Sequence, residues 1–188
     1  MKTVLTLALG LFCSLMASES FAQLTYNESS DGDLSGALGT PTDLIFDLGV
    51  NTITGNIGGS ATGGATNGSD ADYFTFTLGA GEIIDSIVTT RGNTSTTQSF
   101  IGYVAGSSFG GQTAADVDAN TLFDNESLLP GGLLSAPLTT GDHAFWLQET
   151  GGPVDYSISF NVTSAVPEPS SAIALLGLGV VGLVRRKR

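Results

Sequence analysis

The sequence predicts an all-β fold for the body of this chain: an antiparallel, jelly-roll-like β-sandwich between an N-terminal signal helix and a single C-terminal transmembrane helix. Three observations predict this fold. Short runs of alternating apolar and polar residues recur every 8–15 positions, and such alternation places successive side chains on opposite faces of a strand. Turn-forming Gly, Ser, Thr, Asn and Asp residues separate the runs. Before the C-terminal apolar run no long segment has helical periodicity, which favours a sandwich over a helical domain.

Two segments show the alternation most clearly. Residues 155–162 place aromatic and aliphatic side chains on one face, and Ser157, Ser159 and Asn161 on the other. Residues 73–78 place two Phe and one Leu on the buried face and two Thr on the outer face. The other expected strands, in chain order, are residues 43–48, 52–57, 83–89, 100–105, 133–136 and 143–148.

Two segments between the expected strands are predicted to be long loops. Residues 58–68 contain no core-sized side chain, and residues 107–120 are Gly-rich and then acidic. Long loops in a compact domain are where binding residues concentrate. We therefore look for ligand-binding residues beside these two loops.

The N-terminus has the features of a secretory signal peptide. Lys2 gives a positive start, residues 4–16 are apolar, and Ser-Phe-Ala at 20–22 is a small-x-small cleavage site. We expect residues 1–22 to direct the chain to the secretion translocon and to be removed by signal peptidase. Residues 23–165 then have the length of one exported domain.

The C-terminus combines a polar motif, a short apolar run and a basic end. Two prolines in the motif favour an extended backbone that a processing protease can bind. Residues 172–184 cover about 20 Å as a helix, short of the roughly 30 Å hydrocarbon core, and predict a temporary inner-membrane anchor. The basic end should stay cytoplasmic and leave the upstream domain outside. The motif is Val166-Pro167-Glu168-Pro169, and the basic end is Arg185, Arg186, Lys187 and Arg188.

This arrangement, over residues 166–188, resembles the PEP-CTERM sorting signal of Gram-negative bacteria. The resemblance implies recognition by an exosortase, a membrane transpeptidase-like enzyme, with cleavage near the Pro-Glu-Pro motif and an association with exopolysaccharide. An ordinary single-pass tail anchor is the alternative. The same tail is also named the ice-binding protein C-terminal domain. The Thr residues of this chain do not repeat at a fixed period, so we do not expect ice binding from that name.

Charge and cysteine content restrict the function of the exported domain. Residues 23–165 contain sixteen acidic residues and one basic residue, Arg91, for a net charge near −15. Nucleic-acid binding is excluded because phosphate contact needs clustered Lys and Arg, whereas divalent cations are attracted. The only cysteine, Cys13, lies in the signal peptide. The domain therefore has no disulfide and depends on its apolar core.

The central region resembles the bacterial pre-peptidase C-terminal domain, a β-sandwich appended to many secreted proteins. The resemblance covers about residues 52–162 and includes the Asp-x-Asp-Tyr-Phe step at 70–74 and the Gly turn at 79–84. It also includes the Gly turn and aromatic strand at 138–147 and the Tyr-containing final strand at 154–162. The family implies an accessory or binding role with no reaction of its own.

A cation site is predicted where the long first loop meets the next strand. Asn67, Asp70 and Asp72 present oxygen ligands there, and Ca²⁺ takes six to eight hard oxygens. The alternative is an Asx-rich turn that caps the strand. The spacing is not that of an EF-hand. The weaker acidic pairs are Asp116 with Asp118 and Asp124 with Glu126, and Asp31-Gly32-Asp33 is expected to be a turn.

Trp146 is the candidate ligand-binding residue, because an aromatic face can stack on a sugar; Tyr156 is a second. Core packing is the alternative for both. The single histidine, His143, lies next to an acid, but without a Cys or a G-x-S-x-G motif a nucleophilic triad is not expected. Paired carboxylates can serve a glycosidase, yet sixteen acids make some pair inevitable.

These features together predict a non-enzymatic cell-surface or extracellular-matrix protein. Its precursor is anchored in the inner membrane with the β domain in the periplasm, and an exosortase sorts and processes it to the cell surface or beyond. One alternative is a Ca²⁺-dependent module that binds exopolysaccharide. A secreted glycan hydrolase is the other.

Overall fold

The computed structural model describes residues 23–58, 70–92, 99–110, 117–149 and 152–164. These residues belong to one compact unit, Ala22–Ala165. They form ten strands and one short helix. In chain order these are β1 (Thr25–Asn27), α2 (Glu28–Asp31), β2 (Thr42–Asp43), β3 (Gly49–Ile57), β4 (Ala71–Leu78), β5 (Glu82–Arg91), β6 (Ser99–Ala105), β7 (Ala119–Phe123), β8 (Glu126–Leu129), β9 (Gly141–Gln148) and β10 (Val154–Ser164).

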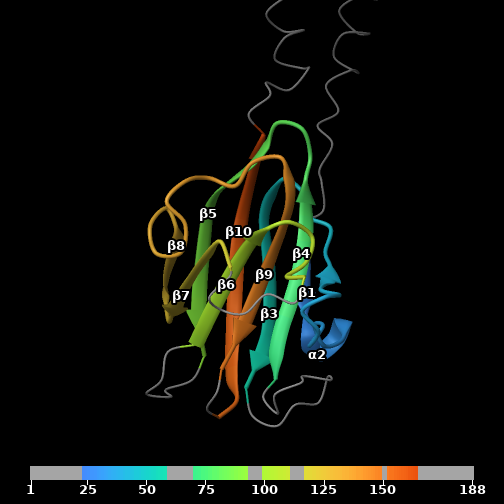
Figure 1. The fold of residues 1–188 in the computed structure, drawn as a ribbon, viewed down its shortest axis with the longest axis vertical. Helices are drawn as coiled ribbons and strands as arrows, with labels where there is room; N and C mark the ends of the chain where they lie inside the picture. Colours follow the sequence, from blue (N-terminus) through green and yellow to red (C-terminus); the bar gives the residue numbers. More distant parts are fainter. Residues whose placement is uncertain (1–22, 59–69, 93–98, 111–116, 150–151, 165–188) are drawn as a thin grey trace, which may run out of the picture. The chain divides into compact units, whose positions relative to one another are not determined.

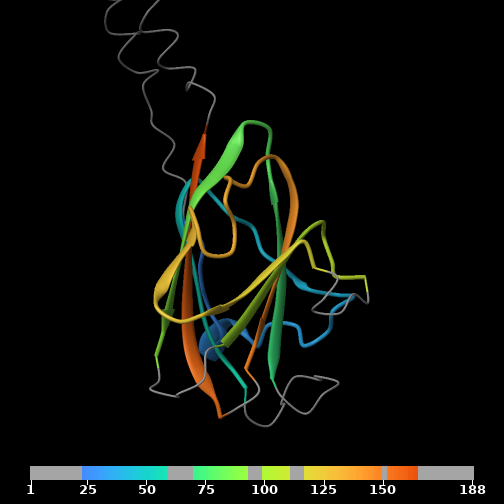
Figure 2. The same ribbon diagram turned by 60° about the vertical axis from the view of Figure 1, so that its left-hand side comes forward.

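The strands form two five-stranded sheets packed face to face (Figure 1). The first sheet has the order β1-β3-β10-β5-β8 and the second the order β2-β4-β9-β6-β7. In Figure 2 the sheet with the orange-red β10 lies on the left and the sheet with the green β4 on the right. Neighbouring strands are antiparallel except for the pairs β1–β3 and β2–β4, in which a short N-terminal strand adds in parallel to a sheet edge. The predicted all-β sandwich is therefore confirmed.

Aromatic side chains fill the space between the two sheets. Phe160 of the first sheet packs against Phe74, Phe76 and Phe145 of the second, with ring centroids 6.0, 5.5 and 5.3 Å away. All four side chains are fully buried. Each edge-to-face contact of this kind contributes about 0.5–1.5 kcal/mol beyond the area it buries. The period-two alternation in β4 and β10 thus produces one continuous core.

A second, smaller apolar cluster lies on the outer face of the second sheet. Tyr73 and Trp146 project from β4 and β9, and the ring of Phe109 lies 5.7 and 6.1 Å from theirs. The Phe109 backbone N–H donates a 3.1 Å hydrogen bond to the carbonyl of Leu38, which joins the two segments that cover this face. This part of the second sheet is therefore closed to solvent.

Six of the eight expected strands are present and slightly longer than expected. The strand expected at 43–48 is wrong beyond Asp43. Leu44 and Phe46 are buried and Ile45 is exposed, but this alternation comes from a segment tucked against the sandwich edge. The strand expected at 133–136 is also wrong, because a turn closed by the 2.9 Å hydrogen bond from Gly131 N–H to the Leu134 carbonyl bends the chain there.

Two edge strands, β7 and β8, are present that the sequence pattern does not predict. β7 begins inside the loop expected at 107–120 and pairs with β6. β8 pairs with β5 and has a register shift beside Val88. Both strands are short, and their side chains do not alternate cleanly between exposed and buried. Periodicity alone therefore could not identify them.

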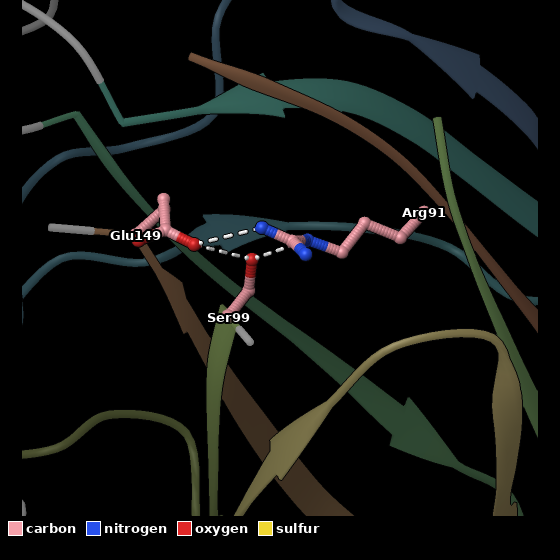
Figure 3. A network of polar contacts seen from close by, with 3 residues as sticks. All are labelled: Arg91, Ser99 and Glu149. Carbon is pink, nitrogen blue, oxygen red and sulfur yellow. Dashed lines mark hydrogen bonds and ion pairs between the residues drawn. The ribbon is translucent and has the colours of Figure 1, made fainter. Parts of the chain in front are cut away.

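The one basic residue between positions 23 and 165, Arg91, is buried in a polar network (Figure 3). Arg91 and Glu149 form an ion pair with Nη2 and Oε2 3.0 Å apart, and both side chains are 2 % exposed. Ser99 Oγ accepts a 3.0 Å hydrogen bond from Arg91 Nε and donates one of 3.0 Å to Glu149 Oε2. The network ties the end of β5 to the start of β6 and the end of β9. Because Arg91 is buried, the described surface of the domain has no exposed cationic side chain.

Candidate functional site

Two of the three predicted metal ligands stand at the start of β4. Asp72 is fully buried, because the strand alternation that points Phe74 into the core also points Asp72 inward. Asp70 precedes the strand and is 8 % exposed. Asn67 lies outside the described residues. The structure therefore describes two of the three predicted ligands. Asp72 lies in the interior, where a charged side chain needs a partner.

The helical turn α2 brings two more carboxylates to the same place. Asn27 caps the turn by accepting a 3.0 Å hydrogen bond from the Ser29 N–H, and Asp31 reaches back to the Asn27 N–H at 2.8 Å. Gly32, with φ of 104°, ends the turn and redirects the chain so that Asp33 follows it. Figure 1 shows α2 near the lower end of the sandwich, where it contacts β3.

Glu28 of this turn is held by the backbone of its neighbours. Its Oε2 accepts a 2.8 Å hydrogen bond from Asn56 N–H, and its Oε1 accepts one of 3.2 Å from Leu34 N–H. The Tyr156 hydroxyl donates a long hydrogen bond of 3.5 Å to Oε1. Gly55 makes this approach possible, because a Cβ at that position would collide with the Glu28 carboxylate and the Tyr156 hydroxyl. The carboxylate is therefore fixed in orientation before any ligand binds.

Three carboxylates meet at this point, which we call the acidic cluster: Glu28, Asp33 and Asp72. One oxygen from each lies within 4.8 Å of the others. Both carboxylate oxygens of Asp72 lack a hydrogen-bond partner of acceptable geometry among the described residues. The Tyr156 hydroxyl lies close enough to lower the pKa of Asp72, but this effect is small beside those that raise it. A buried and unpartnered carboxylate beside two others is strongly unfavourable without a positive charge.

The electrostatic environment of the acidic cluster disfavours ionised carboxylates. Burial, followed by the charge of Glu28, raises the pKa of Asp72 to about 9. Burial also raises the pKa of Glu28 from its ordinary value, against the hydrogen bonds from Asn56 and Leu34. Burial and the charge of Asp33 raise the pKa of Asp70 to about 6. A divalent cation would reverse this tendency, since it stabilises the ionised form of every carboxylate near it.

The spacing and chemistry of the acidic cluster fit Ca²⁺. Each Ca²⁺–oxygen distance is about 2.3–2.6 Å, so two oxygens on one ion lie at most about 5 Å apart. The oxygens of the acidic cluster satisfy this limit. All its donors are hard carboxylate oxygens, and neither His nor Cys takes part, which disfavours Zn²⁺. Asp70 lies beside the acidic cluster and offers a further carboxylate.

The acidic cluster borders an open groove of about 750 Å³ at one end of the sandwich. α2, β3 and β10 supply its walls. Asn56 and Asp155 pair across β3 and β10 through a 2.8 Å hydrogen bond from Asn56 Nδ2 to Asp155 Oδ1. The other lining residues are Asn27, Glu28, Ser29, Asp33, Thr54, Gly55, Asp70 and Tyr156.

The remaining candidate residues lie in the interior. Trp146 is 8 % exposed within the outer apolar cluster, and its indole N–H has no partner among the described residues. As placed, its ring offers little surface to a sugar, and its ligand-binding role stays a prediction. Tyr156 is 3 % exposed.

His143 has both ring nitrogens engaged, Nε2 with the Thr139 carbonyl at 2.7 Å and Nδ1 with the Tyr103 hydroxyl at 2.9 Å. It borders a second, smaller groove of about 400 Å³. This arrangement uses the imidazole to hold the fold together and leaves neither nitrogen for acid–base chemistry. His143 therefore links Thr139 to Tyr103 and has a structural role.

The sorting residues and the basic end, 166–169 and 185–188, lie outside the described residues, as does the expected anchor 172–184. Among the residues that the structure does describe, no helix has the length and apolar character needed to cross a membrane. The predicted domain boundaries at 22 and 165 stay predictions.

Comparison with known proteins identifies the C-terminal segment. Residues 165–188 match the family described as the PEP-CTERM protein-sorting motif. This motif marks an exported protein whose precursor is membrane-anchored and whose processing partner is an exosortase, as expected from residues 166–169. No curated protein matches the chain.

A solved structure similar to this chain is the pre-peptidase C-terminal domain of a collagenase from Bacillus anthracis. The two chains are 13 % identical, with a TM-score of 0.34. The similarity covers 65 % of this chain and 93 % of the other.

Sequence reasoning missed Glu28 and Asp33. Asp33 was expected only as part of a turn, and Glu28 gave no local signal. The parallel pairing of Thr25–Asn27 with Thr52–Thr54 carries α2 to the start of β4. That pairing is a long-range contact, and no short motif announces it.

Proposed function

We propose that this protein is a non-enzymatic cell-surface or extracellular-matrix protein whose β domain binds Ca²⁺ at Glu28, Asp33 and Asp72. The observation that carries the Ca²⁺ site is the burial of Asp72, whose two carboxylate oxygens accept no hydrogen bond from the part of the chain that the structure describes. Bound Ca²⁺ would join the N-terminal turn α2 to strand β4 and stabilise the exported form. The sorting motif at residues 165–188 supports a final location outside the cell, where Ca²⁺ is abundant.

The absence of catalysis is part of this proposal. A glycan hydrolase needs two carboxylates that both reach the substrate, one on each side of the scissile bond. Asp72 is fully buried and cannot do so. His143 is held by Thr139 and Tyr103, which removes it from acid–base work. We therefore assign neither Asp72 nor His143 a catalytic role, and we propose a ligand-binding function in place of the hydrolase alternative.

Titration with Ca²⁺ and with Tb³⁺ tests the cation site. Tyr156 lies beside the acidic cluster, so bound Tb³⁺ should emit on excitation of tyrosine, and Ca²⁺ should displace it. The purified protein should bind one ion, and its melting temperature should rise with Ca²⁺. If calorimetry gives no binding signal and the melting temperature does not change with Ca²⁺, the proposed cation site is wrong.

The sorting role is tested by the double variant Pro167→Ala/Pro169→Ala. The extended motif is lost when both φ constraints are removed, so the variant should accumulate as a larger, membrane-retained precursor. Immunoblots of fractionated cells measure this. A variant with the same size and fraction as the parent would contradict exosortase processing at this motif.

A second candidate function is Ca²⁺-dependent glycan binding at the cell surface. The groove beside the acidic cluster favours it, because its volume lies in the range of small-ligand sites.

A further inference from the structure

The groove is much larger than a cation requires. A bound ion occupies about the space of one water molecule, whose share of liquid volume is roughly 30 Å³. The groove holds about 750 Å³, within the range of roughly 300–1,000 Å³ that small ligands occupy. Most of its volume would therefore remain for a second ligand that contacts the ion.

The groove walls define the charge of that ligand. Neither Lys nor Arg lines the groove, and Asp70 and Asp155 add to the negative field of the acidic cluster. A carboxylate or phosphate ligand would meet repulsion and would find no cationic fork to bind it. An uncharged ligand avoids both penalties.

The groove walls also define the polarity of the ligand. Asn56 donates one hydrogen bond to Asp155 Oδ1, and the second carboxylate oxygen of Asp155 remains available to a hydroxyl donor. Asn27 and Thr54 add amide and hydroxyl groups to the same wall. The aromatic ring of Tyr156 is 3 % exposed and offers no stacking face. Affinity must then come from hydrogen bonds and from the ion, which favours a ligand rich in hydroxyl groups.

The ion itself offers binding positions. Ca²⁺ takes six to eight oxygens, more than the three carboxylates of the acidic cluster supply if each gives one. Water or ligand oxygens fill the remainder. Two neighbouring hydroxyls of one sugar can replace two coordinated waters. One molecule then has to be ordered at the ion in place of two.

We propose that the groove binds an uncharged glycan, a vicinal diol of which completes the coordination of the Ca²⁺ held by Glu28, Asp33 and Asp72. Asn56 and Asp155 bind neighbouring hydroxyls of the same glycan. This inference rests on the proposed function, since the ion must bind first.

The sheet surface next to the groove suits a polymer. Thr54 lines the groove, Ser157 lies opposite it on β10, and Thr90 lies opposite Ser157 on β5. These hydroxyl-bearing positions follow one another at the strand spacing of about 4.8 Å. This spacing is comparable to the length of a sugar ring, so a glycan chain that enters the groove can continue across the first sheet.

The first arm of the test separates the ion from the glycan. Ca²⁺ binding is measured by calorimetry without any sugar. Mannan and dextran, both uncharged and rich in vicinal diols, are then immobilised and exposed to the protein in Ca²⁺ or in EGTA. Dextran that has been oxidised with periodate and reduced with borohydride has lost its vicinal diols and is the matched ligand control. Binding should require both Ca²⁺ and intact diols.

The second arm uses two matched variants on the same sheet. Asn56→Ala removes the groove amide but keeps the backbone N–H that holds Glu28, so Ca²⁺ affinity should be unchanged and glycan affinity should fall about tenfold, as expected for losing about 1.4 kcal/mol. Asn161→Ala removes the corresponding amide of another cross-strand pair, Asn161 Nδ2 to Asp85 Oδ1 at 2.9 Å, which does not line the groove. This variant should bind glycan as the parent does.

The outcomes distinguish the two proposals. If Ca²⁺ binds but neither polysaccharide does, the glycan inference is overturned and the cation site stands. Glycan binding that survives EGTA or periodate treatment, or that Asn161→Ala weakens as much as Asn56→Ala, also overturns the inference. If no Ca²⁺ binds, the proposed function fails first, and the glycan inference fails with it.

Discussion

The carboxylates of Glu28 and Asp72 meet at one end of the sandwich, although one belongs to the N-terminal helical turn and the other to the interior face of β4. The backbone N–H groups of Asn56 and Leu34 fix Glu28, whereas no described residue forms a hydrogen bond with the Asp72 carboxylate. The pair is therefore a source of instability without a cation and a source of stability with one.

Asp72→Asn should have opposite effects on stability with and without Ca²⁺. Because the folded pKa of Asp72 is about 9 against an ordinary 3.8, the metal-free parent loses stability as pH rises from about 4 to about 9. The variant avoids this loss and should be more stable at neutral pH by at least about 1 kcal/mol. It should also lose the Ca²⁺ response. Urea unfolding in EGTA and in Ca²⁺ measures both effects.

Asp43→Asn is the matched control for this change, because Asp43 is exposed and lies outside the groove. It should keep the parent's Ca²⁺ response. If Asp72→Asn and Asp43→Asn behave alike, Asp72 is not a ligand.

Gly55→Ala should weaken Ca²⁺ binding through a steric effect. The added Cβ would collide with the Glu28 carboxylate and the Tyr156 hydroxyl, so Glu28 must leave its position on the Asn56 N–H. We expect Ca²⁺ affinity to fall at least about tenfold, the equivalent of about 1.4 kcal/mol, by calorimetry. Gly39→Ala is the control, since a Cβ there meets nothing within 4 Å. Equal Ca²⁺ affinities in the two variants would exclude Glu28 as a ligand.

Arg91→Met should destabilise the domain strongly. The substitution removes the cation from the buried Glu149 carboxylate, which is 2 % exposed, and breaking a buried ion pair in this way costs about 3–5 kcal/mol. The double variant Arg91→Met/Glu149→Met should recover most of that loss, because neither charge of the pair then remains. Thermal unfolding of the parent, both single variants and the double variant gives the coupling energy. Additive effects would show that the ion pair does not act as a unit.

His143 should make the domain less stable in acid. Burial lowers the pKa of His143 below its ordinary 6.5, so the unfolded chain binds a proton more readily than the folded domain. Its contribution to stability is present above pH 6.5 and is lost as pH falls toward the folded pKa. His143→Gln should remove this part of the pH dependence, whereas the carboxylates contribute equally to both proteins. Identical pH profiles for the free energy of unfolding would contradict this assignment.

The fold could be predicted largely from local alternation. The run in β10 carries large apolar residues on one face and small polar residues on the other, so burial and strand pairing give the same pattern. In β4 the outer face is mostly buried as well, because Tyr73 lies there in the second apolar cluster. In residues 44–48 burial and strand pairing separate: Leu44 and Phe46 are buried and Ile45 exposed without a ladder. Alternation of apolar and polar residues therefore indicates which side chains are buried. It indicates a strand only where a neighbouring strand can pair with the segment.

The site could be predicted only in part for a related reason. Asp70 and Asp72 were recognisable because they flank one residue at the start of a strand. Glu28 and Asp33 reach them through the parallel pairing of β1 with β3, and a contact between distant segments leaves no trace in a short motif. The unpartnered state of Asp72 likewise depends on what surrounds it in three dimensions.

The position of β10 in the first sheet has a consequence for the timing of folding. This strand is the last of the described strands in the chain, yet it lies between β3 and β5 at the centre of its sheet. Until Val154–Ser164 has been synthesised, β3 and β5 have no common neighbour and the first sheet cannot close. Pairing between segments so far apart in the chain slows folding. The sheet that carries Asn56 and Tyr156 can therefore form only when its last strand is available.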